Sequence, residues 1–139
     1  MVSNHTTTSN HSSDRVVRSR NAEMTRAAFL SEGEKLFAKL GFEGVSLEKL
    51  AKQVGSNKTL ISYHFKSKNG LYAAVIDNII SDVTETISAR LHRSDDPVEV
   101  FGNYIRALVF TFAERPTFSS ILMREYTVSY THLTLPTKA

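Results

Sequence analysis

The chain has 139 residues, enough for one compact core, and its 41% hydrophobic and 22% charged residues are ordinary for a soluble globular protein. It contains no cysteine, which excludes a disulfide scaffold, a thiolate metal site and a cysteine nucleophile. No apolar run approaches the ~20 residues that span a bilayer, and the N-terminus lacks the basic and apolar regions of a signal peptide, so we expect a cytoplasmic protein.

The net charge of +3 is concentrated in the first part of the chain. Residues 1–82 hold 11 Lys or Arg and 8 Asp or Glu, whereas residues 83–139 hold 6 of each. Residues 56–68 contain three lysines and no acid. A positive surface strengthens contact with phosphates, although so small a cluster is also typical of an ordinary solvated face.

Residues 1–20 form a polar N-terminal arm. Its first part is Ser, Thr, Asn and His with little apolar content, so we expect it to be disordered. Arg15, Arg18 and Arg20 follow directly. They indicate either a solubilising tail or a basic arm that touches DNA phosphates or the minor groove.

A first helix is predicted over residues 21–40. Asn21 is a suitable N-cap, an apolar stripe recurs at helical spacing, and Gly41 is a typical C-terminal stop. Gly33 lies within the stripe, where the lack of a side chain would let another helix pack closely.

Two short helices follow with a tight break between them. Ser46 caps a helix over residues 47–54, although Lys49 occupies the position where a full capping box needs Glu or Gln. Residues 55–57 (Gly-Ser-Asn) break this helix, and a third helix begins at about residue 58 with Leu60 and Ile61 among its apolar residues.

Three further helices are predicted over residues 70–91, 98–114 and 117 to about 125. Pro97 is typical of a first helical position, and no strand-like alternation occurs, so the expected class is all-α. Residues 127–139 depart from this pattern, because β-branched residues replace the helical periodicity. They are also similar to a peptide that recurs at the ends of translated metagenomic reads, so we expect this tail not to be native to the domain.

The two short helices around Gly55 predict a helix-turn-helix that binds DNA. The second helix needs an apolar inner face, short polar side chains near its start that reach base edges, and flanking donors that hold phosphates. Each polar residue singly has an ordinary structural interpretation, but together they favour DNA. The predicted DNA-binding residues are Ser46, Leu47 (through its backbone N–H), Ser56, Asn57, Lys58, Thr59, Ser62, Tyr63, His64, Lys66 and Lys68.

Residues 25–76 resemble the N-terminal domain of TetR-family transcriptional regulators. The matching positions are Thr25 and Arg26, Leu36 to Ala38, Gly41 and Phe42, Ser46 with Leu50 and Ala51, Gly55, and His64, Phe65, Lys68 and Leu71. The resemblance implies a three-helix DNA-binding domain joined by a fourth helix to a helical ligand-binding and dimerisation domain. It also implies that Lys58, Thr59 and Tyr63 contact bases or nearby backbone, and that Ser46, His64 and Lys68 serve phosphates or orientation.

The chain departs from the family pattern at two places. The turn usually has Gly-Val-Ser, so Ser56 replaces an apolar anchor, and Ser62 stands where an aromatic residue is frequent. Both departures put individual base contacts in doubt and leave the expected fold unchanged.

The sequence predicts four regions: a disordered arm (1–20), the DNA-binding domain (21–82), a partial ligand-binding and dimerisation domain (83–126) and the non-native tail (127–139). Helices four to six offer too few partners to close a ligand pocket. We therefore expect a truncated regulator that binds its operator weakly on its own, and whose full-length form is a homodimer that responds to a small-molecule inducer.

Other classes of function fit less well. Asp95 and Asp96 are placed to cap a helix, the glycines are scattered singly, and no two histidines have helical metal-ligand spacing. We therefore expect no enzyme, no metal and no cofactor. The remaining alternative is a helical protein-interaction module without operator binding, which would lack the steep salt dependence of DNA binding.

Overall fold

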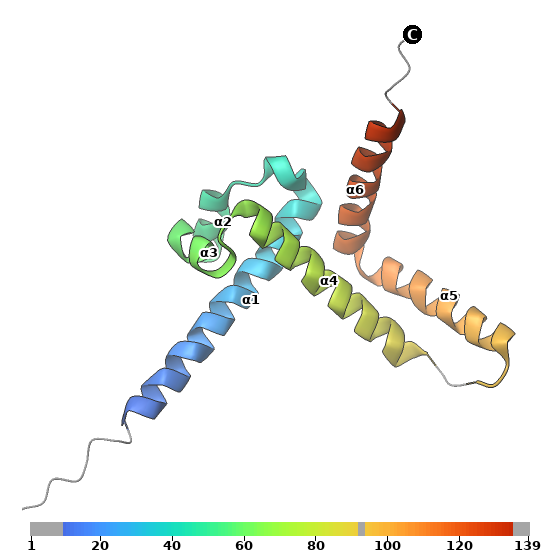
Figure 1. The fold of residues 1–139 in the computed structure, drawn as a ribbon, viewed down its shortest axis with the longest axis horizontal. Coiled ribbons are helices and arrows are strands. Elements are labelled where there is room, and N and C mark those ends of the chain that lie inside the picture. Colours follow the sequence, from blue (N-terminus) through green and yellow to red (C-terminus); the bar gives the residue numbers. More distant parts are fainter. Residues whose placement is uncertain (1–9, 92–93, 135–139) are drawn as a thin grey trace, which may run out of the picture.

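The computed structural model describes residues 10–91 and 94–134, and this part of the chain contains six α-helices and no strand (Figure 1). The helices are α1 (Asn10–Gly44), α2 (Leu47–Gln53), α3 (Lys58–Phe65), α4 (Lys68–Arg90), α5 (Pro97–Glu114) and α6 (Pro116–Thr134). The all-α class predicted from the sequence is confirmed.

The centre of the core lies where α1 and α4 pack together at Gly33. A Cβ atom at Gly33 would lie 3.2 Å from Val75 Cγ2 and 3.8 Å from Leu71 Cδ1, so a side chain there would press on α4. The close helix packing expected at this glycine is confirmed. The side chains around it are almost completely buried: Phe29, Phe37, Leu71, Val75 and Ile79.

The two short helices complete this core from one side. Leu50 and Ala51 of α2 and Ile61 and Phe65 of α3 are buried in the same apolar cluster as the α1–α4 residues. Helices this short are marginal on their own in water, so their stability comes from this packing.

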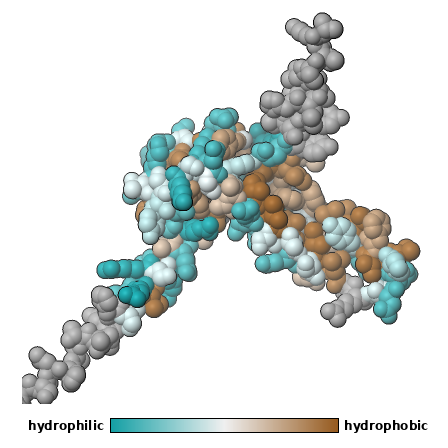
Figure 2. Space-filling view, in the orientation of Figure 1, coloured by the Kyte–Doolittle hydropathy of each residue, from teal (hydrophilic) through white to brown (hydrophobic). Residues whose placement is uncertain are grey.

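The second half of the chain is more open. α5 packs along α4, and Arg115 Nη1, just after α5, forms an ion pair of 3.1 Å with Asp82 Oδ2 of α4. The outer side of α5 is apolar and exposed, with Val98 78%, Phe101 66% and Val109 61% accessible, and brown surface covers this region in Figure 2. None of the described helices is both long and apolar enough to cross a membrane.

The N-terminal end of α1 corrects one expectation. The sequence predicted disorder up to residue 20, but α1 already begins at Asn10, and every side chain from 12 to 20 is exposed. No Gly or Pro interrupts residues 10–24. Once the packed part of the helix is formed, each added residue gains a backbone hydrogen bond without needing apolar burial. Residues 1–9 lie outside the described part.

The predicted stop at Gly41 falls where the backbone leaves the helical region. Gly41 has φ 73° and ψ 173°, and a short helical turn follows it to Gly44. The chain therefore changes direction at Gly41, and this brings Phe42 back onto Phe37 with the ring planes at 9° and the centroids 6.1 Å apart.

The length of α6 corrects a second expectation. The sequence predicted an end at about residue 125, whereas the helix continues to Thr134. No Gly or Pro follows Pro116 until Pro136, and the helix-propensity cost of β-branched residues is well under 1 kcal/mol each. Residues 135–139 lie outside the described part. That the tail is not native to the domain stays a prediction, as does the division of the chain into four regions; the disorder expected for residues 10–20 is wrong.

Replacing Gly33 with Leu should lower the free energy of unfolding by about 1–3 kcal/mol or more, because the new side chain overpacks the α1–α4 contact. Thermal unfolding followed by circular dichroism measures the change. Gly102 of α5 is the matched control, since nothing lies within 4 Å of a Cβ placed there. Gly102→Leu should leave the stability unchanged or raise it, and an equal loss in both variants would contradict the role assigned to Gly33.

Candidate nucleic-acid interface

The turn between α2 and α3 is fixed by its backbone. Gly55 has φ +71°, a left-handed conformation that residues with a side chain rarely adopt. The backbone N–H of Ser56 donates to the carbonyl of Ala51 at 2.8 Å and that of Gly55 to Lys52 at 3.1 Å, which is the bonding of a Schellman helix end. The side chain of Asn57 then caps α3 by accepting from the N–H of Leu60 at 3.0 Å. A helix therefore ends and the next begins within four residues.

Helix α3 has one buried side and one exposed side. Ile61 is fully buried, and Phe65 packs edge-on against Phe29 of α1 with the ring centroids 6.3 Å apart. On the other side Tyr63 is 77% exposed. The packing holds α3 at a fixed angle while its outer side stays accessible.

The structure brings most of the predicted site residues together on this outer side. The exposed ones are Asn57, Lys58, Thr59, Ser62, Tyr63 and Lys66. Ser46, Leu47, Ser56, His64 and Lys68 are half-buried. Ser46 and Leu47 lie at the N-terminus of α2, where the Ser46 side chain caps the helix as predicted.

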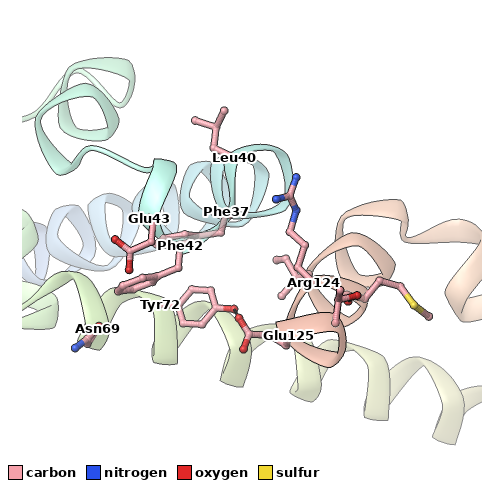
Figure 3. Close-up of a pocket in the computed structure, with 12 residues that line it drawn as sticks. Phe37, Leu40, Phe42, Glu43, Asn69, Tyr72, Arg124 and Glu125 are labelled. Atoms are coloured by element: carbon pink, nitrogen blue, oxygen red, sulfur yellow. Dashed lines mark hydrogen bonds between the residues drawn. The ribbon is translucent and has the colours of Figure 1, made fainter. Parts of the chain in front are cut away.

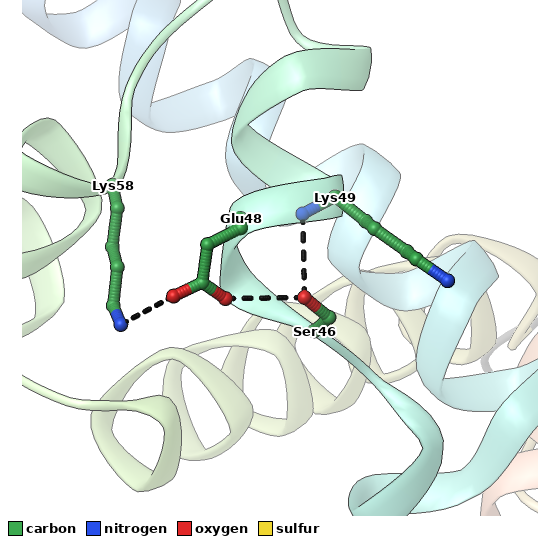
Figure 4. A network of polar contacts seen from close by, with 4 residues as sticks. All are labelled: Ser46, Glu48, Lys49 and Lys58. Atoms are coloured by element: carbon green, nitrogen blue, oxygen red, sulfur yellow. Dashed lines mark hydrogen bonds and ion pairs between the residues drawn. The ribbon is translucent and has the colours of Figure 1, made fainter.

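A residue that the sequence analysis missed, Glu48, links the two short helices (Figure 4). Its Oε1 forms an ion pair of 2.5 Å with Lys58 Nζ, and its Oε2 accepts a hydrogen bond of 3.1 Å from Ser46 Oγ. The hydrogen bond from Lys58, aided by a backbone N–H and by Ser46, lowers the pKa of Glu48 to about 2. The sequence does show Glu48 as an acidic residue in the first turn of the predicted second helix. Its partner Lys58, however, lies ten positions further along the chain.

Two of the predicted residues face the inside of the domain. The His64 ring lies 6.4 Å from that of Phe29 and 5.1 Å from that of Tyr63, measured between centroids. Lys68 Nζ lies 4.6 Å from the centre of the Phe42 ring and donates to the carbonyl oxygen of Glu43 at 3.4 Å. His64 therefore connects α3 to α1, and Lys68 connects the start of α4 to the end of α1.

Ser56 makes an unfavourable contribution to the stability of the turn. Its hydroxyl oxygen is buried and has no hydrogen-bond partner in the described part of the chain. A buried polar group without a partner costs about 1–3 kcal/mol. The position that the sequence analysis marked as lacking an apolar anchor is thus also unfavourably polar.

A separate cavity of about 830 Å³ lies between the end of α1, the start of α4 and α6 (Figure 3). Phe37, Phe42 and Tyr72 contribute aromatic rings, and no lining residue belongs to α2 or α3. The Tyr72 hydroxyl donates to Glu125, and its burial together with this carboxylate raises the pKa of Tyr72. Arg124 Nη2 donates to the carbonyl of Lys39 at 3.0 Å. These two bonds attach α6 to α4 and to α1.

Comparison with known proteins gives a family match for the helix-turn-helix region. Residues 29–75, which reach from the middle of α1 into α4, match the model of the bacterial regulatory proteins of the tetR family.

Three relatives match a longer part of the chain. The HTH-type transcriptional repressor NicS of Pseudomonas putida is 28% identical over 109 residues, covering 78% of this chain and 51% of NicS. The HTH-type transcriptional regulator RutR of Escherichia coli is 32% identical over 109 residues, covering 78% of this chain and 50% of RutR. The negative regulator IcaR of the icaADBC biofilm operon in Staphylococcus aureus is 25% identical over 80 residues, covering 58% and 43%. The chain spans about half the length of the first two relatives.

Replacing Ser56 with Ala should raise the free energy of unfolding by about 1 kcal/mol, because it removes a buried hydroxyl that has no partner. Chemical denaturation measures the change. Ser62→Ala, on the exposed side of α3, is the control and should change the stability by less than about 0.5 kcal/mol. A lower stability for Ser56→Ala would show that the hydroxyl makes a favourable contact.

The pKa of Glu48 gives a pH-dependent prediction. Because folding lowers this pKa from 4.5 to about 2, the stabilisation is fully present above pH 4.5 and is lost as the pH falls towards 2. Glu48→Gln removes the stabilisation by the charged carboxylate. The difference in free energy of unfolding between wild type and variant should therefore shrink as the pH falls from 4.5 towards 2. Denaturation at a series of pH values measures it. Glu23→Gln on α1 is the matched control, because it removes an exposed carboxylate that has no ion-pair partner in the described part.

Proposed function

Because residues 29–75 belong to the tetR family of bacterial regulatory proteins, we propose that this chain binds operator DNA through α3 and acts as a transcriptional regulator of the repressor type. The observation that carries the proposal is the two-sided character of α3. Its inner side is locked against α1 and α2, and its outer side presents polar and cationic groups without a single exposed acid.

The shape of α3 suits the major groove. Eight residues make a helix about 12 Å long, comparable with the groove width of about 12 Å. Thr59 and Tyr63 are one turn apart and share a face, as do Lys58 and Ser62. In the proposal these four side chains, together with Asn57, approach the base edges and the nearest phosphates.

The flanking residues divide into two roles. Lys66 is exposed next to Tyr63, and the N–H of Leu47 lies at the positive end of α2, so both are proposed to hold phosphates. His64 and Lys68 are proposed to orient the helices, because their contacts are with Phe29, Phe42 and Glu43. Ser56 and Ser46 likewise shape the turn and the start of α2.

Glu48 places a negative charge next to the proposed contact. Its carboxylate holds the Lys58 ammonium at the edge of α3 and is itself 64% exposed. A phosphate close to this pair is attracted by the Lys58 ammonium and repelled by the Glu48 carboxylate. The binding free energy therefore depends on where the DNA docks relative to the pair. Such opposed charges favour specificity over plain affinity.

The finer parts of the proposal concern the whole protein. We expect a homodimer that contacts two operator half-sites and a small-molecule inducer that releases it, both of which follow from the resemblance to the family. A regulator of bacterial operators acts in the cytoplasm, where the DNA is. The function requires no catalytic step.

Selection from a pool of duplexes with a randomised centre tests the proposal directly. The chain should enrich a common half-site, and its affinity for that duplex should fall steeply with added salt. If no sequence is enriched and binding is insensitive to salt, DNA is not the ligand. The exposed apolar side of α5 would then favour the alternative, a helical protein-interaction module.

Substitutions on α3 locate the contact. Lys58→Ala and Tyr63→Ala should each weaken binding of the enriched duplex by about tenfold or more. Tyr63→Ala should leave thermal stability nearly unchanged because its side chain is exposed, whereas Lys58→Ala also removes the ion pair with Glu48 and should lower it. Fluorescence anisotropy measures the affinities. Arg106→Ala is the control, because Arg106 is an exposed cation on α5. Equal effects at all three positions would indicate a response to net charge alone.

A further inference from the structure

The N-terminal part of α1 has no packing role that accounts for it. Residues 12–24 are all exposed. In Figure 1 this part of α1 extends well past α2 and α3. Arg15, Arg18 and Arg20 make no ion pair or hydrogen bond within the described part of the chain.

Three of the arginines on α1 share one face. Arg15 and Arg18 are three residues apart, and Arg26 follows Arg15 after eleven residues, which is about three turns at 3.6 residues per turn. Arg20 points elsewhere, at least about 120° around the helix from each of the three.

The position of Arg26 shows which way this face looks. Its guanidinium carbon lies 5.2 Å from the centre of the Phe65 ring, at the last residue of α3. The Arg15–Arg18–Arg26 face is therefore the face of α1 next to the C-terminal end of α3, continued about 16 Å beyond it at 1.5 Å per residue.

We propose that the Arg15–Arg18–Arg26 face of α1 binds phosphates of the DNA that flanks the base pairs contacted by α3. The inference rests on the proposed function and adds a second contact element to it. The guanidinium groups are exposed and unpaired by acids, and they complement the phosphate charge. A reach of about 16 Å corresponds to about five base pairs at 3.4 Å each, so the contact needs flanking DNA on one side of the half-site.

Single substitutions and two duplex lengths test this inference. One duplex ends at the edge of the selected sequence, and the other carries ten further base pairs of random sequence on each side. On the long duplex, Arg15→Ala and Arg18→Ala should each weaken binding several-fold and reduce the slope of log affinity against log salt by about one. On the short duplex both variants should bind like the wild type.

Arg20→Ala is the matched control, because it removes the same charge from the same helix on another face. It should leave the binding of both duplexes close to that of the wild type. Alanine favours helix, so circular dichroism should show unchanged helicity in all three variants.

The outcomes separate the two proposals. If the wild type binds neither duplex, the proposed function fails and this inference fails with it. If the wild type binds, but Arg15→Ala and Arg18→Ala match Arg20→Ala on the long duplex, only the α1 contact is overturned. An equal loss on the short duplex would also overturn it, because the contact would then not lie in flanking DNA.

Discussion

The packing of α1 against α4 at Gly33 is the contact on which the other helices depend. Phe29 and Phe37 meet Leu71 and Val75 there, and together they provide the apolar surface that α2 and α3 cover. Neither α2 nor α3 is long enough to be a stable helix alone. The angle at which α3 presents its outer side is therefore set by a contact between two other helices.

The same framework connects α3 to α6. Phe37 and Phe42 pack against Tyr72, and Tyr72 donates a hydrogen bond to Glu125 of α6. A displacement of α6 would act on the end of α1 and the start of α4, which are the two segments that adjoin the helix-turn-helix. Binding at one end of the molecule can be coupled to the other in this way only if the two positions of α6 differ in free energy. The aromatic cluster supplies a continuous contact through which such a difference can act.

The sequence was informative where periodicity and turn chemistry agree. Ser46, Gly55 and the apolar spacing of α2 and α3 predicted the helix-turn-helix, and the buried residues Leu50 and Ile61 lie where the pattern placed them. The ends of α1 and α6 were not predictable in the same way, because an exposed helix without Gly or Pro has no apolar pattern to mark its limits. The Glu48–Lys58 ion pair also escaped prediction, since its geometry exists only after the turn at Gly55 brings two helices together.

In the proposed function, the charge distribution gives the candidate interface its specificity. In the proposed complex, Lys58, Lys66 and the arginines of α1 supply attraction that acts on any DNA, whereas Glu48 introduces repulsion next to Lys58. Attraction alone would hold the domain on every duplex with similar strength. A carboxylate whose pKa is held at about 2 stays charged at any physiological pH, so this repulsion is permanent. Only a docking position that brings Lys58 closer to a phosphate than Glu48 is favourable, and the rigid turn between α2 and α3 limits how many positions satisfy that condition.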